Sequence, residues 1–397
     1  MVNSARAALT AALLTATAAA TSGQPAAGQD AAGQPAAATR PGDAWAHPGA
    51  HPTGDHYNAG ESRLTAANAA ALRRRWSVPL AKAVCADPAP PLVAAGRLVT
   101  AAAYRISAYD AASGALRWRT PDRGKRRITL AAAVGDTLVA QWTDCRSGRD
   151  HLTAVHLPTG RTRYTRQLPE VLHTTVVDAG VLLGEYWDAG ASRYALAARR
   201  ISDGSLLWTR SPGSFNGSPV SARGRVRFST ATAASAVHDI RTGRLLWRTP
   251  PGCPTPRGAA PDGGHLYLTC TDGRILRVDA GTGALGATFP GPEEPHGFAS
   301  DGRRVYQRGF GPDRLIAVDA RTGAPVWSVP NADVHDLAVA GGVVYGARTG
   351  RPPLAVVAAT GERIRLAAPL AAVTGQPMVA YGRLYAVTGA EVTAYAP

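Results

Sequence analysis

Several kinds of residue and motif are scarce in this chain of 397 residues. Aromatic residues make up 6% of it, and there are 4 cysteines and 2 methionines. Helical patterns with a period of 3.6 residues are nearly absent. The exception is Thr65 to Arg75, an alanine-rich stretch that Ser62 or Thr65 would cap. No G-x-S-x-G, H-E-x-x-H or P-loop motif occurs, so the sequence gives no pattern of a serine hydrolase, a zinc protease or a P-loop nucleotidase.

Lysine is also scarce, although the net charge is +15. The only lysines are Lys82 and Lys125, so the charge comes almost wholly from arginine. Many arginines follow a turn glycine at regular intervals and do not gather in one stripe. This spacing favours solvated turn residues, and we expect no nucleic-acid partner. The runs 73–75 and 125–127 leave an anionic partner open.

The N-terminal segment predicts a secreted, extracellular protein. Residues 1–20 look like a signal peptide, with a positive start at Arg6, an apolar stretch and small residues for cleavage at 18–20. This stretch is too short and too weakly apolar to be a membrane span. Residues 21–54 form a low-complexity linker rich in Ala, Gly and Pro, and residues 55–397 form the folded domain.

One pattern recurs along the folded domain: a strand, a tight turn with glycine, and a second strand that ends on an aromatic residue. It is clearest at Leu315 to Trp327 and recurs at Ser107 to Trp118, Ala197 to Trp208 and Ala236 to Trp247. The turn glycines are Gly114, Gly160, Gly204, Gly243, Gly283, Gly323 and Gly361. They lie 38 to 46 residues apart, the length of one four-stranded propeller blade.

The two ends of the domain supply one further blade. Glu391 to Pro397 matches the strand before the turn, and Leu72 to Val78 matches the strand after it. If these two segments pair in one sheet, the ring closes without a large unpaired edge. We therefore predict an all-β fold, an eight-bladed β-propeller closed between its N-terminal and C-terminal strands.

The cysteines predict disulfides. Cys253 and Cys270 flank a hairpin expected at 262–264, at nearly matching distances from its turn, so we expect them to be bonded. Cys85 and Cys145 would then tie neighbouring blades. No CxxC pair occurs, which argues against the alternative of a metal site.

The repeat resembles that of pyrroloquinoline quinone (PQQ) dehydrogenase-like propellers. Their signature, A-x-D-x-x-T-G-x-x-x-W, is intact from Ala317 to Trp327, nearly intact at 110–118 and 239–247, and degenerate at 155–164 and 356–365. The segment from Gly54 to Trp76 is similar to the lead-in of quinoproteins. The resemblance implies the fold and says little about activity, because this propeller serves dehydrogenases, outer-membrane assembly scaffolds and kinase sensors. It also implies that the repeat tryptophans dock one blade against the next: Trp76, Trp118, Trp208, Trp247 and Trp327.

An enzyme of this family would need calcium ligands, a carboxylate base and a clamp for the quinone. In many of these enzymes a disulfide between adjacent cysteines stacks on the cofactor. This chain has no adjacent cysteines, and no calcium triad falls on a motif. We expect no cofactor, with PQQ and calcium as the alternative.

Candidate ligand-binding residues follow from counting back from each hairpin turn to the start of the innermost strand. They are His173, Asn216, Arg257, His296, His335, Asp336 and Gln376, with Asp87 and Arg127 at the first two blades. We predict that they ring the mouth of the channel, with His296 and His335 in adjacent blades. A wet channel mouth that needs no ligand is the alternative. His47, His51 and His56 are interpreted as residues of a solvated lead-in, with adventitious metal binding as the alternative.

The sequence does not name a substrate or assign catalytic residues. We expect a secreted, monomeric, non-catalytic binding or scaffold propeller that presents its channel mouth or a face to a protein, peptide or saccharide. The alternative is an enzyme that uses the channel, such as a PQQ-dependent alcohol or aldose dehydrogenase.

Overall fold

The computed structural model describes residues 44–81, 89–122, 124–231, 233–291, 297–309, 313–348, 350–366, 370 and 373–397. The expected signal peptide and residues 21–43 of the expected linker lie outside this part. Residues Thr39–Pro397 form one compact unit, and the fold below is that of this unit. None of the helices in the described ranges is long and apolar enough to cross a membrane.

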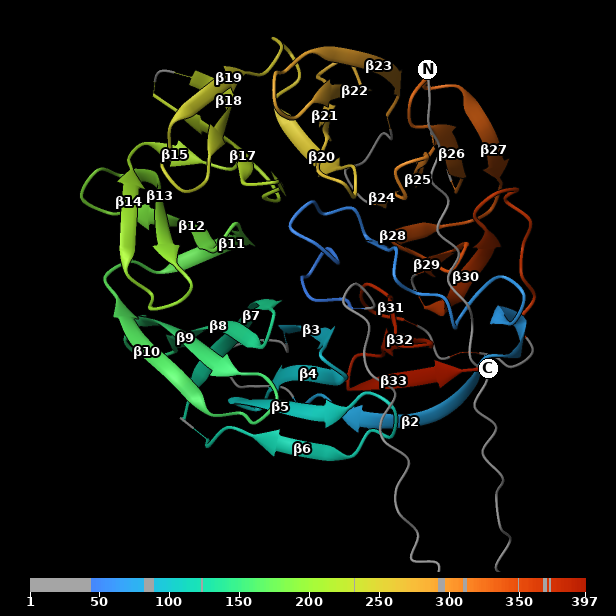
Figure 1. Cartoon of the computed structure of the whole chain (residues 1–397), viewed down its shortest axis with the longest axis horizontal. Coiled ribbons are helices and arrows are strands. Elements are labelled where there is room, and N and C mark those ends of the chain that lie inside the picture. Colours follow the sequence, from blue (N-terminus) through green and yellow to red (C-terminus); the bar gives the residue numbers. More distant parts are fainter. Residues whose placement is uncertain are drawn as a thin grey trace, which may run out of the picture. The chain divides into compact units, whose positions relative to one another are not determined.

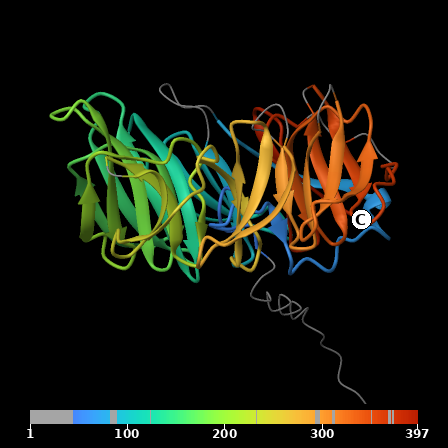
Figure 2. The same ribbon diagram turned by 90° about the horizontal axis from the view of Figure 1, so that it is seen from above.

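Eight sheets, antiparallel except for the parallel pair of β1 with β28, surround a common axis, which confirms the predicted eight-bladed propeller (Figure 1). In the perpendicular view of Figure 2, the strands of each blade run from one face of the ring to the other.

The strands are given from the axis outward. Blade 1 contains β3 (Ala89–Ala94), β4 (Arg97–Ala102), β5 (Arg105–Asp110) and β6 (Leu116–Arg119). Blade 2 contains β7 (Arg126–Val134), β8 (Thr137–Asp144), β9 (Asp150–His156) and β10 (Thr162–Leu168). Blade 3 contains β11 (Leu172–Asp178), β12 (Val181–Asp188), β13 (Arg193–Arg200) and β14 (Leu206–Arg210). Blade 4 contains β15 (Gly213–Ser214) and β16 (Ser221–Ala222), both paired with β17 (Arg225–Thr230), then β18 (Ala233–Asp239) and β19 (Leu245–Arg248).

The second half of the ring follows the same order. Blade 5 contains β20 (Thr255–Ala259), β21 (His265–Thr269), β22 (Arg274–Asp279) and β23 (Leu285–Pro290). Blade 6 contains β24 (Phe298–Ser300), β25 (Arg304–Arg308), β26 (Leu315–Asp319) and β27 (Pro325–Val329). Blade 7 contains β1 (Tyr57–Asn58), β28 (Val334–Ala340), β29 (Val343–Arg348) and β30 (Arg351–Val357). Blade 8 contains β31 (Met378–Ala380), β32 (Arg383–Val387), β33 (Glu391–Ala396) and β2 (Arg73–Pro79).

The ring closes as the sequence predicts. Strand β2 pairs antiparallel with β33, from Arg73 opposite Ala396 to Pro79 opposite Glu391. The predicted helix at 65–75 is wrong: only a 3-10 turn forms at η1 (Ala69–Ala71), and β2 begins at Arg73. The reason is tertiary, because pairing with the C-terminal strand stabilises an extended chain where local propensity favours helix.

The repeat tryptophans dock successive blades, as the resemblance implies. The indole N–H of Trp247 donates to the carbonyl of Ala280 in the next blade at 3.1 Å. A Cβ built on the turn glycine Gly283 would lie only 2.8 Å from the Trp247 ring. The same pair recurs as Trp76 over Gly114, Trp118 over Gly160, Trp208 over Gly243 and Trp327 over Gly361. In blade 2 the degenerate repeat places Tyr164 over Gly204, with its hydroxyl donating to the Ile201 carbonyl.

The repeat aspartates fix the turns between the third and fourth strands. A carboxylate oxygen of Asp319 accepts hydrogen bonds from the backbone N–H groups of Arg321 and Thr322 at 3.0 and 2.7 Å. Gly323 in the same turn has a φ of 75°, which favours glycine. Where the aspartate and tryptophan are both missing, at 356–365, the described residues form no strand outside β30, and a bridge pairs Val356 with Arg363.

A buried carboxylate joins blades 2 and 3. Asp150 is fully buried and accepts hydrogen bonds from the Thr143 hydroxyl at 2.6 Å and from the backbone N–H of Leu172 at 3.0 Å. Burial raises the pKa of Asp150 to about 6, because a low-dielectric site disfavours its ionised form.

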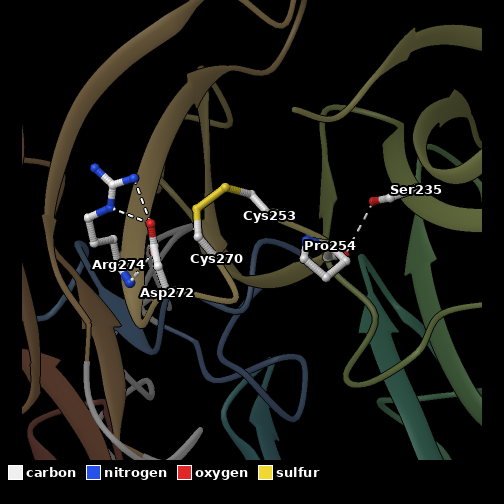
Figure 3. The surroundings of a disulfide bond; sticks show 6 residues. All are labelled: Ser235, Cys253, Pro254, Cys270, Asp272 and Arg274. Atoms are coloured by element: carbon white, nitrogen blue, oxygen red, sulfur yellow. Dashed lines mark hydrogen bonds and ion pairs between the residues drawn. A yellow bond between two sulfur atoms is a disulfide. The ribbon is translucent and has the colours of Figure 1, made fainter. Parts of the chain in front are cut away.

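The predicted disulfide between Cys253 and Cys270 is confirmed (Figure 3). Cys253 precedes β20, and Cys270 follows β21, so the bond ties the two ends of the inner hairpin of blade 5. Cys145 is also disulfide-bonded. Its predicted partner, Cys85, lies outside the described residues.

Candidate functional site in the centre of the ring

Residues 44–58, named the lead-in here, lie inside the ring and contact the inner strands of all eight blades (Figure 1). Trp45 and Val93 of blade 1 exchange two backbone hydrogen bonds of 2.7 and 2.9 Å. Backbone oxygens of the lead-in accept from the N–H groups of Ala133, Ser221, Ala259, Ser300 and Val339, in blades 2, 4, 5, 6 and 7. The N–H of Val177 donates to His47 Nε2, and the amide of Asn58 donates to Val379 of blade 8.

This placement corrects the interpretation of the three lead-in histidines as solvated. His47 is 8% exposed, and Trp45 and Asp55 are fully buried. The lead-in supplies acceptors to inner-strand N–H groups that would otherwise face the channel without a partner.

A pocket of about 390 Å³, named the central pocket here, lies between the lead-in and the inner strands. Three histidines of the lead-in line one side: His47, His51 and His56. Blades 3, 4, 5, 7 and 8 supply the polar groups of the walls: Thr174, Thr175, Ser218, Arg257, Asp336 and Gln376.

Asp336, which lines the pocket, and the buried Asp55 beside it are each paired with a histidine. His51 Nδ1 lies 3.0 Å from Asp55 Oδ1, and Asp55 also accepts from the backbone N–H of Tyr57. His335 Nδ1 lies 3.0 Å from Asp336 Oδ2. Burial acts to lower the pKa of His51, but the hydrogen bond and charge of Asp55 outweigh it and raise that pKa above its usual value. Each pair is therefore an imidazole oriented by a carboxylate.

The other two histidines of the pocket are neutral near pH 7. Burial, with the nearby His51 and His56, lowers the pKa of His47 to about 3. The acceptor role of its Nε2 toward Val177 agrees with a neutral ring. Burial also lowers the pKa of His56, whose Nδ1 is hydrogen-bonded to the Gln376 amide. Arg257 remains charged, since burial lowers its pKa only to about 10.

The structure brings some of the sequence-predicted residues together. Arg257, Asp336 and Gln376 line the central pocket, and His335 reaches it through its contact with Asp336. His173 and Asn216 are exposed and do not line it. Arg127 is half-buried beside Asp150, whose pKa it acts to lower. His296 and Asp87 lie outside the described residues.

Sequence reasoning missed the lead-in histidines and the hydroxyls of Thr174, Thr175 and Ser218. The one available signal was the density of His47, His51 and His56 beside Asp55 within ten residues. Four polar side chains so close together are unusual for an inert linker.

A second pocket, named the closure pocket here, adjoins the central pocket where blades 8 and 1 meet. It has a volume of about 350 Å³, and Pro48 and Gln376 line both pockets. Its wall is mostly apolar: Trp45, Pro48, Leu80, Ala89, Pro90, Pro91, Met378 and Val387, with Thr374, Gly375, Gln376 and Gly389.

The ring of repeat-built blades, docked by tryptophan over glycine, defines a PQQ-like β-propeller. The chain belongs to the family described as outer membrane protein assembly factor BamB, whose sequence profile matches residues 17–179, 74–286, 286–364 and 311–396. No curated protein matches the chain in sequence.

Solved structures share the fold at low identity. BamB from Moraxella catarrhalis is 16% identical with a TM-score of 0.58, over 82% of this chain and 100% of that one. Quinohemoprotein alcohol dehydrogenase from Comamonas testosteroni is 14% identical with a TM-score of 0.61, over 90% and 81%. A europium-containing methanol dehydrogenase is 13% identical with a TM-score of 0.61, over 90% and 99%. Because all three identities are this low, the likeness concerns the fold alone.

The described residues of the central pocket do not fit PQQ with calcium. Calcium takes six to eight oxygen ligands, several of them carboxylates. Here Asp55 and Asp336 are each bonded to an imidazole, and no group of three His, Cys, Asp or Glu side chains in the described ranges could hold a metal ion.

Proposed function

We propose that the chain is a secreted, non-catalytic binding propeller that presents the mouth of its central pocket to a protein, peptide or saccharide. The observation that carries the proposal is the pairing of the acidic groups at the pocket. Asp55 and Asp336 are both engaged by histidines, so in the described part of the chain neither carboxylate is open to calcium, and donors and acceptors remain for recognition.

Two further points support the proposal. The lead-in occupies the axis of the ring, so the pocket is walled on that side by the chain's own backbone. Hydroxyl, amide, guanidinium and imidazole groups line the rest, a mixture that suits a polar ligand or a polar surface of a partner. The protein is then expected to act as a monomer without a cofactor.

An enzyme that uses the same pocket is the second candidate. One observation favours it: Asp55 orients His51, which is 36% exposed and has a raised pKa, as an acid–base histidine requires. This candidate depends on His51, whereas the binding proposal depends on the whole mouth.

Calorimetric titration of the purified chain with PQQ, with and without calcium, tests the proposal. We expect that PQQ adds no heat of binding to the heat measured with calcium alone. Stoichiometric, calcium-dependent binding would overturn the proposal and favour a dehydrogenase.

A cross-linking experiment tests the binding role directly. A photo-reactive residue at His335, which contacts Asp336 of the pocket, should give a discrete cross-linked species in the extracellular fraction of the culture that produces the protein. The same residue at Leu285, which is 68% exposed on the outer rim, is the matched control and should give none. Equal cross-linking from both positions would contradict a specific role of the mouth.

A further inference from the structure

The outer edge of blade 7 departs from the repeat at two positions. Relative to the turn glycine Gly361, Val357 stands where the intact repeat of blade 6 has aspartate, and Arg365 stands where it has tryptophan. A tryptophan is not needed here, because it would cover the turn glycine of the next blade. Blade 8 has no such turn, since its two outer strands, β33 and β2, come from the two ends of the domain. The edge of blade 7 can therefore carry side chains that blade docking does not require.

A pocket of about 390 Å³, named the edge pocket here, lies at this edge. Three arginines line it, together with an apolar wall that includes Leu354 and Leu366: Arg348, Arg363 and Arg365. None of its described lining residues belongs to the central pocket or the closure pocket. The edge pocket is therefore a separate, positively charged site on the outer side of the ring.

The guanidinium groups of the edge pocket are not neutralised by carboxylates. Elsewhere on the rim, arginines pair with acidic residues, as Arg117 does with the repeat aspartate Asp110 at 2.8 Å. Within the described ranges, the three arginines of the edge pocket form no such ion pair. Arg348 and Arg363 donate instead to backbone carbonyls of Pro352 and of Asn331, at 2.8 and 3.3 Å. A carbonyl holds a guanidinium group in place without cancelling its charge.

The positive charges at this edge also act on one another. Burial and the charges of Arg351 and Arg363 lower the pKa of Arg348, while the carboxylate of Asp333 acts in the opposite direction. From residue 337 to 390 the sequence contains one acidic residue, Glu362. A bound anion would relieve this repulsion, so the charge complementary to the site is negative.

The apolar wall decides which anion fits. Leu354 is 6% exposed, and Ile364 and Leu366 are half-buried beside the arginines. A phosphate or sulfate polymer would leave this wall in water, whereas a peptide can place an apolar side chain on it and acidic side chains on the arginines. Pro352 and Pro353 of β30 lack backbone N–H groups, so the strand edge is a poor template for an added strand. Recognition then depends on side chains.

We propose that the edge pocket binds an acidic segment of a partner protein. An apolar side chain of that segment contacts the wall at Leu354 and Leu366, and flanking carboxylates pair with Arg348, Arg363 and Arg365. This site is separate from the mouth in the proposed function and does not depend on it.

The test measures binding of the peptide Asp-Glu-Leu-Glu-Asp, blocked at both ends, to the full chain by calorimetry at low ionic strength. We expect one site with micromolar affinity. Arg363→Gln combined with Arg365→Gln should weaken binding about tenfold, because two ion pairs are lost. The matched control combines Arg161→Gln with Arg321→Gln, at exposed turn arginines of blades 2 and 6. It removes the same charge and should bind as the wild type does.

A second variant avoids the hydrogen bond between Arg363 and the backbone. Arg365→Glu reverses the charge of an exposed side chain and should also weaken binding about tenfold, with thermal unfolding unchanged. The peptide Asp-Glu-Ser-Glu-Asp tests the apolar wall. It should bind at least tenfold more weakly than the leucine peptide, since one leucine side chain is no longer buried.

Three results would overturn the proposal: no binding of the leucine peptide to the wild type, equal binding to the two double variants, or equal binding of the two peptides. If polyphosphate binds in an Arg365-dependent way while the leucine peptide does not, the site takes phosphate polymers and the acidic peptide is wrong.

Discussion

The outer rim and the centre of the ring are built by different parts of the chain. At the rim, contacts between neighbouring blades follow the repeat: at five of them a tryptophan of one blade covers the turn glycine of the next. At the centre, one non-repeated segment, the lead-in, contacts every blade in turn. The rim is therefore held by similar contacts between neighbouring blades. The centre is held by a single stretch of about fifteen residues that contacts blades far apart in the sequence.

The largest effect on stability is expected from disrupting one contact between a repeat tryptophan and the turn glycine of the next blade. Gly283→Ala places a methyl group 2.8 Å from the Trp247 ring and also strains a φ of 76°. We expect a loss of about 3 kcal/mol in the free energy of unfolding, measured with urea. Gly180→Ala is the control: its φ is 79° and nothing lies within 4 Å, so about 1 kcal/mol should be lost. Equal losses would show that the tryptophan contact is unimportant.

An effect of similar size is expected in the blade whose repeat position lacks a tryptophan. In blade 5 the repeat position is Ala287, and this is the blade that carries the disulfide between Cys253 and Cys270. Replacing both cysteines with alanine should cost about 3 kcal/mol in the chain-entropy account of a loop of this size. Thermal unfolding of the double variant, compared with the wild type under reducing and oxidising conditions, measures it. An unchanged melting temperature would contradict a stabilising role.

The joint between blades 2 and 3 should respond to pH. Because the pKa of Asp150 is raised to about 6 in the fold, its stabilising contribution is fully present below pH 3.8 and is lost as pH rises through 6. The wild type should therefore lose stability relative to Asp150→Asn between pH 4 and 7, by on the order of 2–3 kcal/mol. Paired urea titrations across that range measure the difference, and a constant difference would refute the assignment.

The smallest expected effects on stability distinguish residues that hold the lead-in in place from residues beside the central pocket. Asn58 is fully buried and donates to the Val379 carbonyl at 2.8 Å, so Asn58→Ala should cost about 2 kcal/mol. His335 is half-buried beside Asp336 of the pocket, and His335→Ala should cost less than about 0.5 kcal/mol. Chemical unfolding of the two variants gives the comparison. A larger loss for His335→Ala would make it a structural residue.

The rim could be predicted from the sequence because its joints repeat. Gly323, Asp319 and Trp327 each have counterparts at the same spacing, and the closure of β2 on β33 followed from two incomplete repeats. The cysteine pair of blade 5 followed from its symmetry about one turn.

The centre could be predicted only in part, for a physical reason. The lead-in is held mainly by its backbone carbonyls, which any residue supplies, so its sequence of Gly, Pro and His carries no periodic signal. Among the mouth residues, counting back from the turns found the correct strands for Arg257 and Asp336. It wrongly placed Asn216 at the pocket. The inner edge of blade 4 is divided into β15 and β16, and Asn216 lies between these two strands.

The span of the lead-in contacts has a consequence for folding kinetics. Asn58 donates a hydrogen bond to Val379, 321 residues further along the chain. Strand β2 can pair only when β33, the last strand of the sequence, is present. Contacts of such high sequence separation slow folding, since loop closure must precede any gain from them. The earliest part of the domain to leave the ribosome is thus among the last to find its place. During that interval the inner strands lack the acceptors that the lead-in later supplies, and unpaired edges of this kind favour self-association until the ring is complete.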